Sequence, residues 1–316
     1  MAKTPLLDPE HPIDRRHALE CMVWAGTGVL WTLSGGIPRS VGLIGEARAA
    51  EPVKGFTFLQ MSDSHIGFDK AANPDALGTL REAVAKVKAM QAKPSFIIHT
   101  GDITHLSKPG EFDNADKVFS ETGVQIHYVP GEHDIIDEDR GKAYLERYGK
   151  GSKGAGWYSF DDHGVHFIGL VNVVDLKGGG LGNLGEEQLA WLEADLKDRS
   201  NSTPIVVFAH IPLQVIYEQW GWGTQDGTRV LMMLKRFGSV TILNGHIHQL
   251  AQKVEGNITF HTAMSTAFPQ PAPGAAPSPG PMVVPAERLR AMLGLSSVTV
   301  TQGDKPLAFI DTTLAG

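Results

Sequence analysis

The chain has 316 residues, of which 42% are hydrophobic and 20% charged, and its formal net charge is −7 at pH 7. These proportions are typical of a soluble globular protein, and the length suits one large domain or two ordinary ones. The negative balance disfavours binding to nucleic acid or to an anionic membrane through bulk positive charge. An anionic substrate would need local positive charge, which bound metal ions would supply.

The first 49 residues have the layout of an export signal. Arg15 and Arg16 precede a weakly apolar stretch over residues 21–44, and the small-residue sequence Ala47-Arg48-Ala49 follows it. A charged region, an apolar region and a cleavage site in that order predict export. The arginine pair resembles a twin-arginine signal, so we expect the twin-arginine export machinery as a partner and a periplasmic or extracellular location.

Two features of this segment depart from a simple pattern. Asp14, His17 and Ala18 surround the arginines, where a twin-arginine signal favours a hydroxyl residue and a bulky apolar one. An uncleaved membrane anchor is the alternative interpretation, but glycines, a proline and Arg39 interrupt the run before about 18 apolar residues. We therefore expect no stable membrane span after cleavage. The only cysteine, Cys21, lies in this segment, so the mature chain would have no disulfide.

After residue 50, short apolar runs alternate with longer amphipathic ones, which predicts a sheet covered by helices. The expected strands are residues 56–61, 96–99, 125–129, 165–170, 205–209 and 240–243. The expected helices are residues 74–90, 111–120, 139–148, 185–197 and 225–237.

The C-terminal part of the chain has a different pattern. Hairpins are expected between residues 250–254 and 258–261, and between residues 297–301 and 307–312. The stretch 268–285 is rich in proline, alanine and glycine, which predicts an extended loop or flap. We therefore expect a catalytic domain over residues 50–267. Residues 268–316 would add a proline-rich loop, a helix and a β-hairpin packed on it.

Histidine and acidic residues follow five of the expected strands directly. The motifs are Asp63-Ser64-His65, Gly101-Asp102, Gly131-Glu132-His133-Asp134, His210, and Gly245-His246-Ile247-His248. In α/β sheets the carboxyl ends of strands are where ligands bind, so these loops are expected to meet at one cleft. Glycines before Asp102, Glu132 and His246 would permit tight turns close to a ligand.

Nitrogen and carboxylate ligands of this number suit a pair of divalent ions about 3.5–4 Å apart. Such ions would neutralise phosphate oxygens, lower the pKa of a bound water to supply hydroxide, and stabilise an in-line displacement. Their identity is left open among manganese, iron and zinc. The set therefore predicts a metal-dependent phosphoester hydrolase.

The ordered motifs resemble the calcineurin-like metallophosphoesterase family across residues 56 to about 262. The resemblance implies an α/β sandwich of mixed sheets flanked by helices, with the site at the carboxyl ends of strands. It also implies ligand roles: Asp63, His65 and His248 for the first metal, Asp102 as a bridge, and Glu132, His210 and His246 for the second. His133 would act as an acid from outside the metal shell, with Asp134 orienting its ring.

Glu132 departs from the family, which usually has asparagine there. As a ligand, its carboxylate would hold the ions more tightly and make them weaker Lewis acids, with a shift toward iron or manganese. The alternative is that Glu132 turns away and one metal is weakly held. A metal-binding or partner-binding protein with weakened catalysis is therefore the alternative to the enzyme.

The segment from Gly101 to Phe112 looks most like the branch with bacterial cyclic-nucleotide phosphodiesterases, which implies a diester substrate. A nuclease is disfavoured by the acidic balance. His105 is a candidate substrate contact, and the remaining histidines are expected to be structural. The aromatic residues of the loop 215–224, Tyr217, Trp220 and Trp222, predict either a hydrophobic plug or a wall for a planar group.

Overall fold

A computed structural model describes residues 30–34, 37–41, 55–301 and 307–315, and the chain divides into two compact units, Met1–Val53 and Lys54–Gly316. In the first unit, strands β1 (Leu30–Ser34) and β2 (Ile37–Val41) pair antiparallel. They fall within the stretch predicted as the apolar region of an export signal. The arginine pair, Cys21 and residues 47–49 lie outside the described residues. No helix in the described part of the chain is long and apolar enough to span a membrane.

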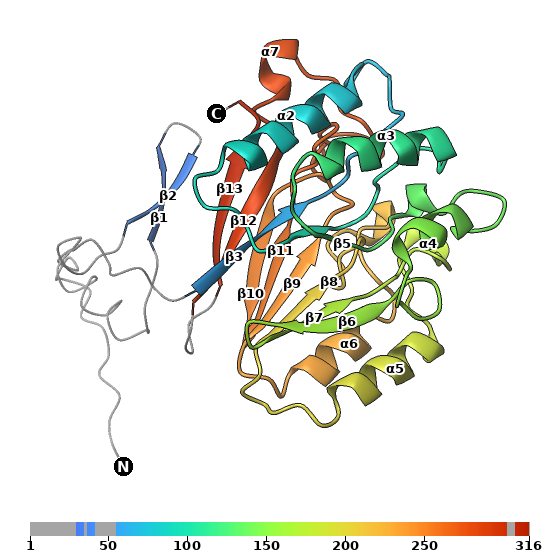
Figure 1. Cartoon of the computed structure of the whole chain (residues 1–316), viewed down its shortest axis with the longest axis vertical. Coiled ribbons are helices and arrows are strands. Elements are labelled where there is room, and N and C mark those ends of the chain that lie inside the picture. The colour runs from blue at the N-terminus through green and yellow to red at the C-terminus, as the bar shows by residue number, and fades with distance from the viewer. Residues whose placement is uncertain (1–29, 35–36, 42–54, 302–306, 316) are drawn as a thin grey trace, which may run out of the picture. The chain divides into compact units, whose positions relative to one another are not determined.

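The second unit contains two sheets (Figure 1). The five-stranded sheet has the order β13-β12-β3-β4-β5, with β3 (Gly55–Met61), β4 (Ile97–His99), β5 (Ile126–Tyr128), β12 (Gly294–Thr301) and β13 (Ala308–Thr313). The six-stranded sheet has the order β10-β11-β9-β8-β7-β6, with β6 (Tyr158–Asp162), β7 (Val165–Gly169), β8 (Ile205–Phe208), β9 (Val240–Asn244), β10 (Ala251–Glu255) and β11 (Ile258–Thr262).

Alternation along the strands produces three apolar layers. In β3, Phe56 and Phe58 point into a core shared with Phe167 and Phe208 of the other sheet. The next residue, Leu59, points to the opposite face, into a separate core beneath two helices. Because successive side chains of a strand face opposite sides, both faces of each sheet must be covered. The unit is therefore a sandwich of two sheets with helices outside, as the sequence predicted.

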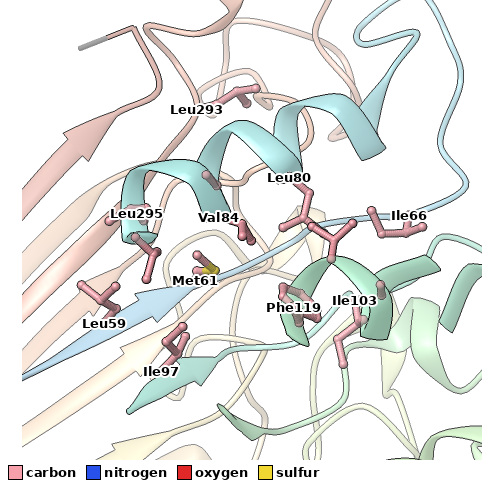
Figure 2. Close-up of a cluster of buried hydrophobic side chains, with 14 of the residues drawn as sticks. Leu59, Met61, Ile66, Leu80, Val84, Ile97, Ile103, Phe119, Leu293 and Leu295 are labelled. Atoms are coloured by element: carbon pink, nitrogen blue, oxygen red, sulfur yellow. The ribbon is translucent and has the colours of Figure 1, made fainter. Parts of the chain in front are cut away.

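Helices α2 (Ala76–Ala89) and α3 (Pro109–Ser120) cover the five-stranded sheet, and α5 (Glu186–Leu196) and α6 (Gly227–Leu234) cover the other (Figure 1). Leu80, Ala83, Val84 and Val87 give α2 a buried stripe at helical spacing. Figure 2 shows Leu80 and Val84 in the same cluster as Met61 of β3. Helix α4 (Lys142–Tyr148) follows β5 in the chain. All the predicted helices and strands are present, with small shifts at their ends.

Strand β6 was not predicted. It pairs antiparallel with β7 at the edge of its sheet. Its sequence ends in Asp161 and Asp162, which interrupt the apolar pattern expected of a strand. Both predicted hairpins are present as β10–β11 and β12–β13. Strand β12 also pairs with β3, so the C-terminal strands extend the five-stranded sheet. Residues 268–285 are loop, and a short helix, α7 (Ala286–Leu289), follows them.

Candidate metal centre

Five parallel strands deliver the predicted site residues to one edge of the sandwich. Strands β3, β4 and β5 run parallel in one sheet, as β8 and β9 do in the other, and each is followed by one of the motifs. The loops are joined through their backbones, because Asp63 N donates to Gly101 O at 3.0 Å and His65 N to Asp102 O at 2.9 Å. The loops therefore hold one another in register.

The backbone at this edge is strained. Five of the predicted ligands have a positive φ angle, which is uncommon outside glycine. The angles are 53° for Asp63, 40° for His65, 53° for Asp102, 67° for His246 and 52° for His248. Such strain costs on the order of 1–3 kcal/mol per residue and tends to persist where function requires it. Its concentration in these residues marks the edge as the functional site.

Two of the predicted turn glycines are needed for close approach. Gly101 has φ of 95°, and a β-carbon there would lie 2.6 Å from Nδ1 of His210. At Gly245 a β-carbon would lie 2.5 Å from Oδ2 of Asp63 and closer still to Ser62. Larger residues would therefore displace the side chains of the site.

The first ligand group consists of Asp63, His65, Asp102 and His248. One potential ligand atom of each lies within 4.8 Å of all the others, and every member is buried. Nε2 of His248 lies 3.2 Å from Oδ1 of Asp63 and 3.2 Å from Nε2 of His65. These atoms converge on one point, as ligands of a single ion do.

The second ligand group consists of Glu132, His210 and His246. Oε2 of Glu132 lies 2.9 Å from Nε2 of His210, and Oε1 lies 3.0 Å from Nδ1 of His246. Glu132 thus points into the site, and the alternative in which it turns away is wrong. Oδ2 of Asp102 lies 3.4 Å from Nε2 of His65 and 3.3 Å from Nε2 of His210, between the two groups. The groups match the predicted ligand sets, and the ligand roles stay predictions.

Burial and neighbouring side chains set the protonation states of three predicted ligands, Asp63, Glu132 and His65. Burial raises the pKa of the Asp63 carboxyl, but His248 and His210 outweigh it and bring the pKa to about 2. For Glu132, burial is likewise outweighed by His246 and His210, which hold its pKa well below the ordinary value. Burial, aided by His133, lowers the pKa of His65. Both carboxylates are therefore ionised and His65 is neutral at neutral pH, which are the forms that bind metal.

The donor set fits a pair of metal ions. Within the described residues, the buried polar atoms that lack a hydrogen-bond partner include Oδ2 of Asp63, Oε2 of Glu132, Nε2 of His210 and Nδ1 of His246. A buried polar group without a partner is costly, so such a cluster calls for a cation. Nδ1 of His210 donates to the Thr100 carbonyl at 2.7 Å, which leaves Nε2 for a ligand.

The predicted role of Asp134 is wrong. Its carboxylate accepts hydrogen bonds from the backbone of Gly131, Ile103 and Thr104 and from the Thr104 hydroxyl. The ring of His133 is held instead through Nδ1, which donates to the His105 carbonyl at 2.8 Å. Asp134 is fully buried, and its carboxylate joins two site loops by accepting hydrogen bonds from their backbone N–H groups.

His105, the candidate substrate contact, lies at the site. Its ring stacks on that of His133 with centroids 4.8 Å apart, and its Nδ1 lies 3.4 Å from Nδ1 of His65. Other histidines have structural partners: His166 lies between Asp161 and Asp195, and His261 contacts Asp311.

The aromatic residues of the loop 215–224 differ in burial. Trp222 is 1% exposed and lies edge-on to Trp220, with ring centroids 5.1 Å apart. Trp220 is only partly buried and lies edge-on to Tyr217. Trp222 therefore acts as a plug, whereas the other two rings retain accessible surface.

The model of the calcineurin-like phosphoesterase family matches residues 56–250. The chain therefore belongs to this family, as the motifs indicated, and is a phosphoester hydrolase. Over 228 residues it is 27% identical to a probable glycerophosphodiester phosphodiesterase of Arcobacter nitrofigilis, covering 66% of this chain and 77% of that protein. Over 247 residues it is 26% identical to a probable cyclic nucleotide phosphodiesterase of Rhodococcus erythropolis, covering 71% of this chain and 75% of that protein.

Solved structures share the fold. A dimetal phosphatase from Danio rerio superposes with a TM-score of 0.59 at 15% identity, covering 83% of this chain and 99% of that one. A purple acid phosphatase from yellow lupin gives a TM-score of 0.57 at 13% identity, covering 83% of this chain and 52% of that one. The sandwich is therefore that of the metallophosphoesterases.

Proposed function

We propose that this protein is an exported phosphodiesterase that acts with two metal ions held by the two ligand groups. The observation that supports this most is the position of Asp102, whose Oδ2 lies within 3.4 Å of a ligand nitrogen in each group. A carboxylate shared in this way suits the bridge of a dinuclear site. When bound, such ions neutralise phosphate oxygens and make a water molecule more acidic.

The residues around the ions would complete the reaction. Attack of water forms one bond to phosphorus as the bond to the leaving alcohol breaks; the water releases a proton to solvent, and the leaving oxygen takes up a proton. His133 is placed for this, because Nδ1 donates to the His105 carbonyl and leaves Nε2 to give the proton. One of its ring nitrogens lies within 4.8 Å of a carboxylate oxygen of Asp102 and of Glu132.

Two lines of support point to a diester. The relatives in Arcobacter and Rhodococcus carry the names of a glycerophosphodiester and a cyclic nucleotide phosphodiesterase. The segment from Gly101 to Phe112 resembles the same branch of the family. Export is supported by the charged, apolar and small-residue regions of the first 49 residues.

The test measures turnover of bis-p-nitrophenyl phosphate and p-nitrophenyl phosphate by metal-free protein after addition of manganese, iron or zinc. We expect faster turnover of the diester with at least one metal, and its loss on chelation. Glycerophosphocholine and a cyclic nucleotide then distinguish the two kinds of diester. No turnover of either nitrophenyl ester with any metal would overturn the proposal and favour the metal-binding or partner-binding alternative.

A further inference from the structure

The segment that follows β11 contacts the loop carrying two of the predicted ligands. Residues 268–271 lie beyond the part of the chain that the family model matches, which ends at residue 250. Nδ1 of His248 donates to the Phe268 carbonyl at 2.6 Å. Nε2 of Gln270 donates to the His246 carbonyl at 2.8 Å. The segment therefore holds the ring of His248 through one hydrogen bond and the backbone of His246 through another.

The ligand loop in turn holds the same segment. Nε2 of Gln249 donates to the carbonyls of Gln270, at 3.1 Å, and Pro271, at 2.7 Å. Oε1 of Gln270 accepts from Gly280 N at 3.1 Å, which extends the connection into the proline-rich stretch. Because hydrogen bonds run in both directions, neither segment can shift without breaking bonds to the other.

The ring of Phe268 packs directly on the first ligand group. Its centroid lies 4.7 Å from that of His65, 4.7 Å from that of His248 and 4.3 Å from that of Phe68. Phe268 is 3% exposed. The ring therefore restricts the rotation of both imidazoles.

We propose that residues 268–271 form a clamp that positions the metal ligands of this chain, with Phe268 and Gln270 as its positioning residues. The inference rests on the proposed two-metal site. Phe268 acts on His65 and His248, and so on the first ion. Gln270 acts on the backbone of His246, and so on the second. Groups that orient ligands in this way change metal affinity by about 10–100-fold when removed.

The test compares Phe268→Leu and Gln270→Ala in the full chain. Phe268→Leu keeps the carbonyl that accepts from His248 and removes only the ring contacts. Its matched control is Phe237→Leu, a ring 1% exposed in the core beneath α6. Asn257→Ala is the control for Gln270→Ala, since the Asn257 amide also donates to backbone carbonyls, those of Leu234 and Phe237.

The measurements are calorimetric titration of metal-free protein with Mn²⁺ and anomalous diffraction from crystals at limiting Mn²⁺. We expect Phe268→Leu to weaken binding of the first ion, and Gln270→Ala that of the second, each on the order of tenfold. Unchanged affinity in both variants, or equal losses in the controls, would overturn the clamp. Fewer than two ions on the wild-type chain would instead overturn the two-metal function on which the clamp rests.

Discussion

Nε2 of His210 lies 2.9 Å from Oε2 of Glu132, and both atoms are buried without a hydrogen-bond partner in the described part of the chain. Two facing groups of this kind are stable only if something else satisfies them. A cation would do so, and the same arrangement places the carboxylate where the family usually has a neutral amide. We therefore expect the affinity and acidity of a second ion to depend on Glu132.

Replacing Glu132 by Gln removes a negative charge and keeps the length of the side chain. Because His246 and His210 hold the pKa of Glu132 well below its ordinary value, the wild-type residue is ionised at neutral pH. We expect the variant to bind its second Mn²⁺ at least about tenfold more weakly, measured by calorimetric titration.

The exposed variant Glu138→Gln serves as the charge control and should bind both ions as the wild type does. Turnover at saturating metal gives a second result. A large gain in Glu132→Gln or Glu132→Asn would identify the natural carboxylate as a brake on catalysis. Unaltered affinity would show that Glu132 is not a ligand.

Replacing His133 by Gln tests the proposed acid. Proton transfer from a positioned side chain contributes about 10²–10⁴-fold to rate. We expect kcat to fall by a factor in that range for a diester with an alkyl leaving group and by much less for bis-p-nitrophenyl phosphate, since nitrophenolate leaves without a proton. KM and Mn²⁺ affinity should stay near wild type.

His163→Gln is the matched control, because that histidine is exposed in the turn between β6 and β7. Equal losses on the two kinds of diester would argue for a ligand or packing role of His133 instead of acid catalysis.

The polar motifs were predictable because each comes shortly after the carboxyl end of a predicted strand, so the chain itself places them at one edge. The contacts that orient these side chains were not predictable from the sequence. Asp134 bonds to the backbone of Ile103 and Thr104, and Phe268 lies 20 residues beyond His248. Such partners are set by tertiary packing between loops distant in sequence, and no spacing motif records them.

The export proposal is tested in cells by replacing Arg15 and Arg16 with lysine. Both charges remain, so a general charged signal would still function, whereas recognition of the arginine pair would be lost. We expect the variant to accumulate in the cytoplasm with an uncleaved N-terminus, detected by fractionation and mass spectrometry. A variant that still reaches the periplasm would rule out the twin-arginine route.

His127 makes acid stability of the fold testable away from the metal site. Its ring stacks on Phe160 with centroids 4.0 Å apart and lies edge-on to Phe96. Burial lowers its pKa to about 4 from an ordinary value of 6.5, with Asp162 acting weakly in the opposite direction. The unfolded chain therefore binds the proton first as pH falls, so this stabilisation is complete above pH 6.5 and is lost toward pH 4.

His127→Leu keeps an apolar side chain at this position and removes the titration. Between pH 7 and pH 4, we expect the free energy of unfolding of metal-free wild type to fall by about 3 kcal/mol more than that of the variant. Urea unfolding at a series of pH values measures the difference, in which the carboxylates common to both proteins cancel. Parallel curves for the two proteins would mean that His127 is protonated equally in the folded and unfolded chains.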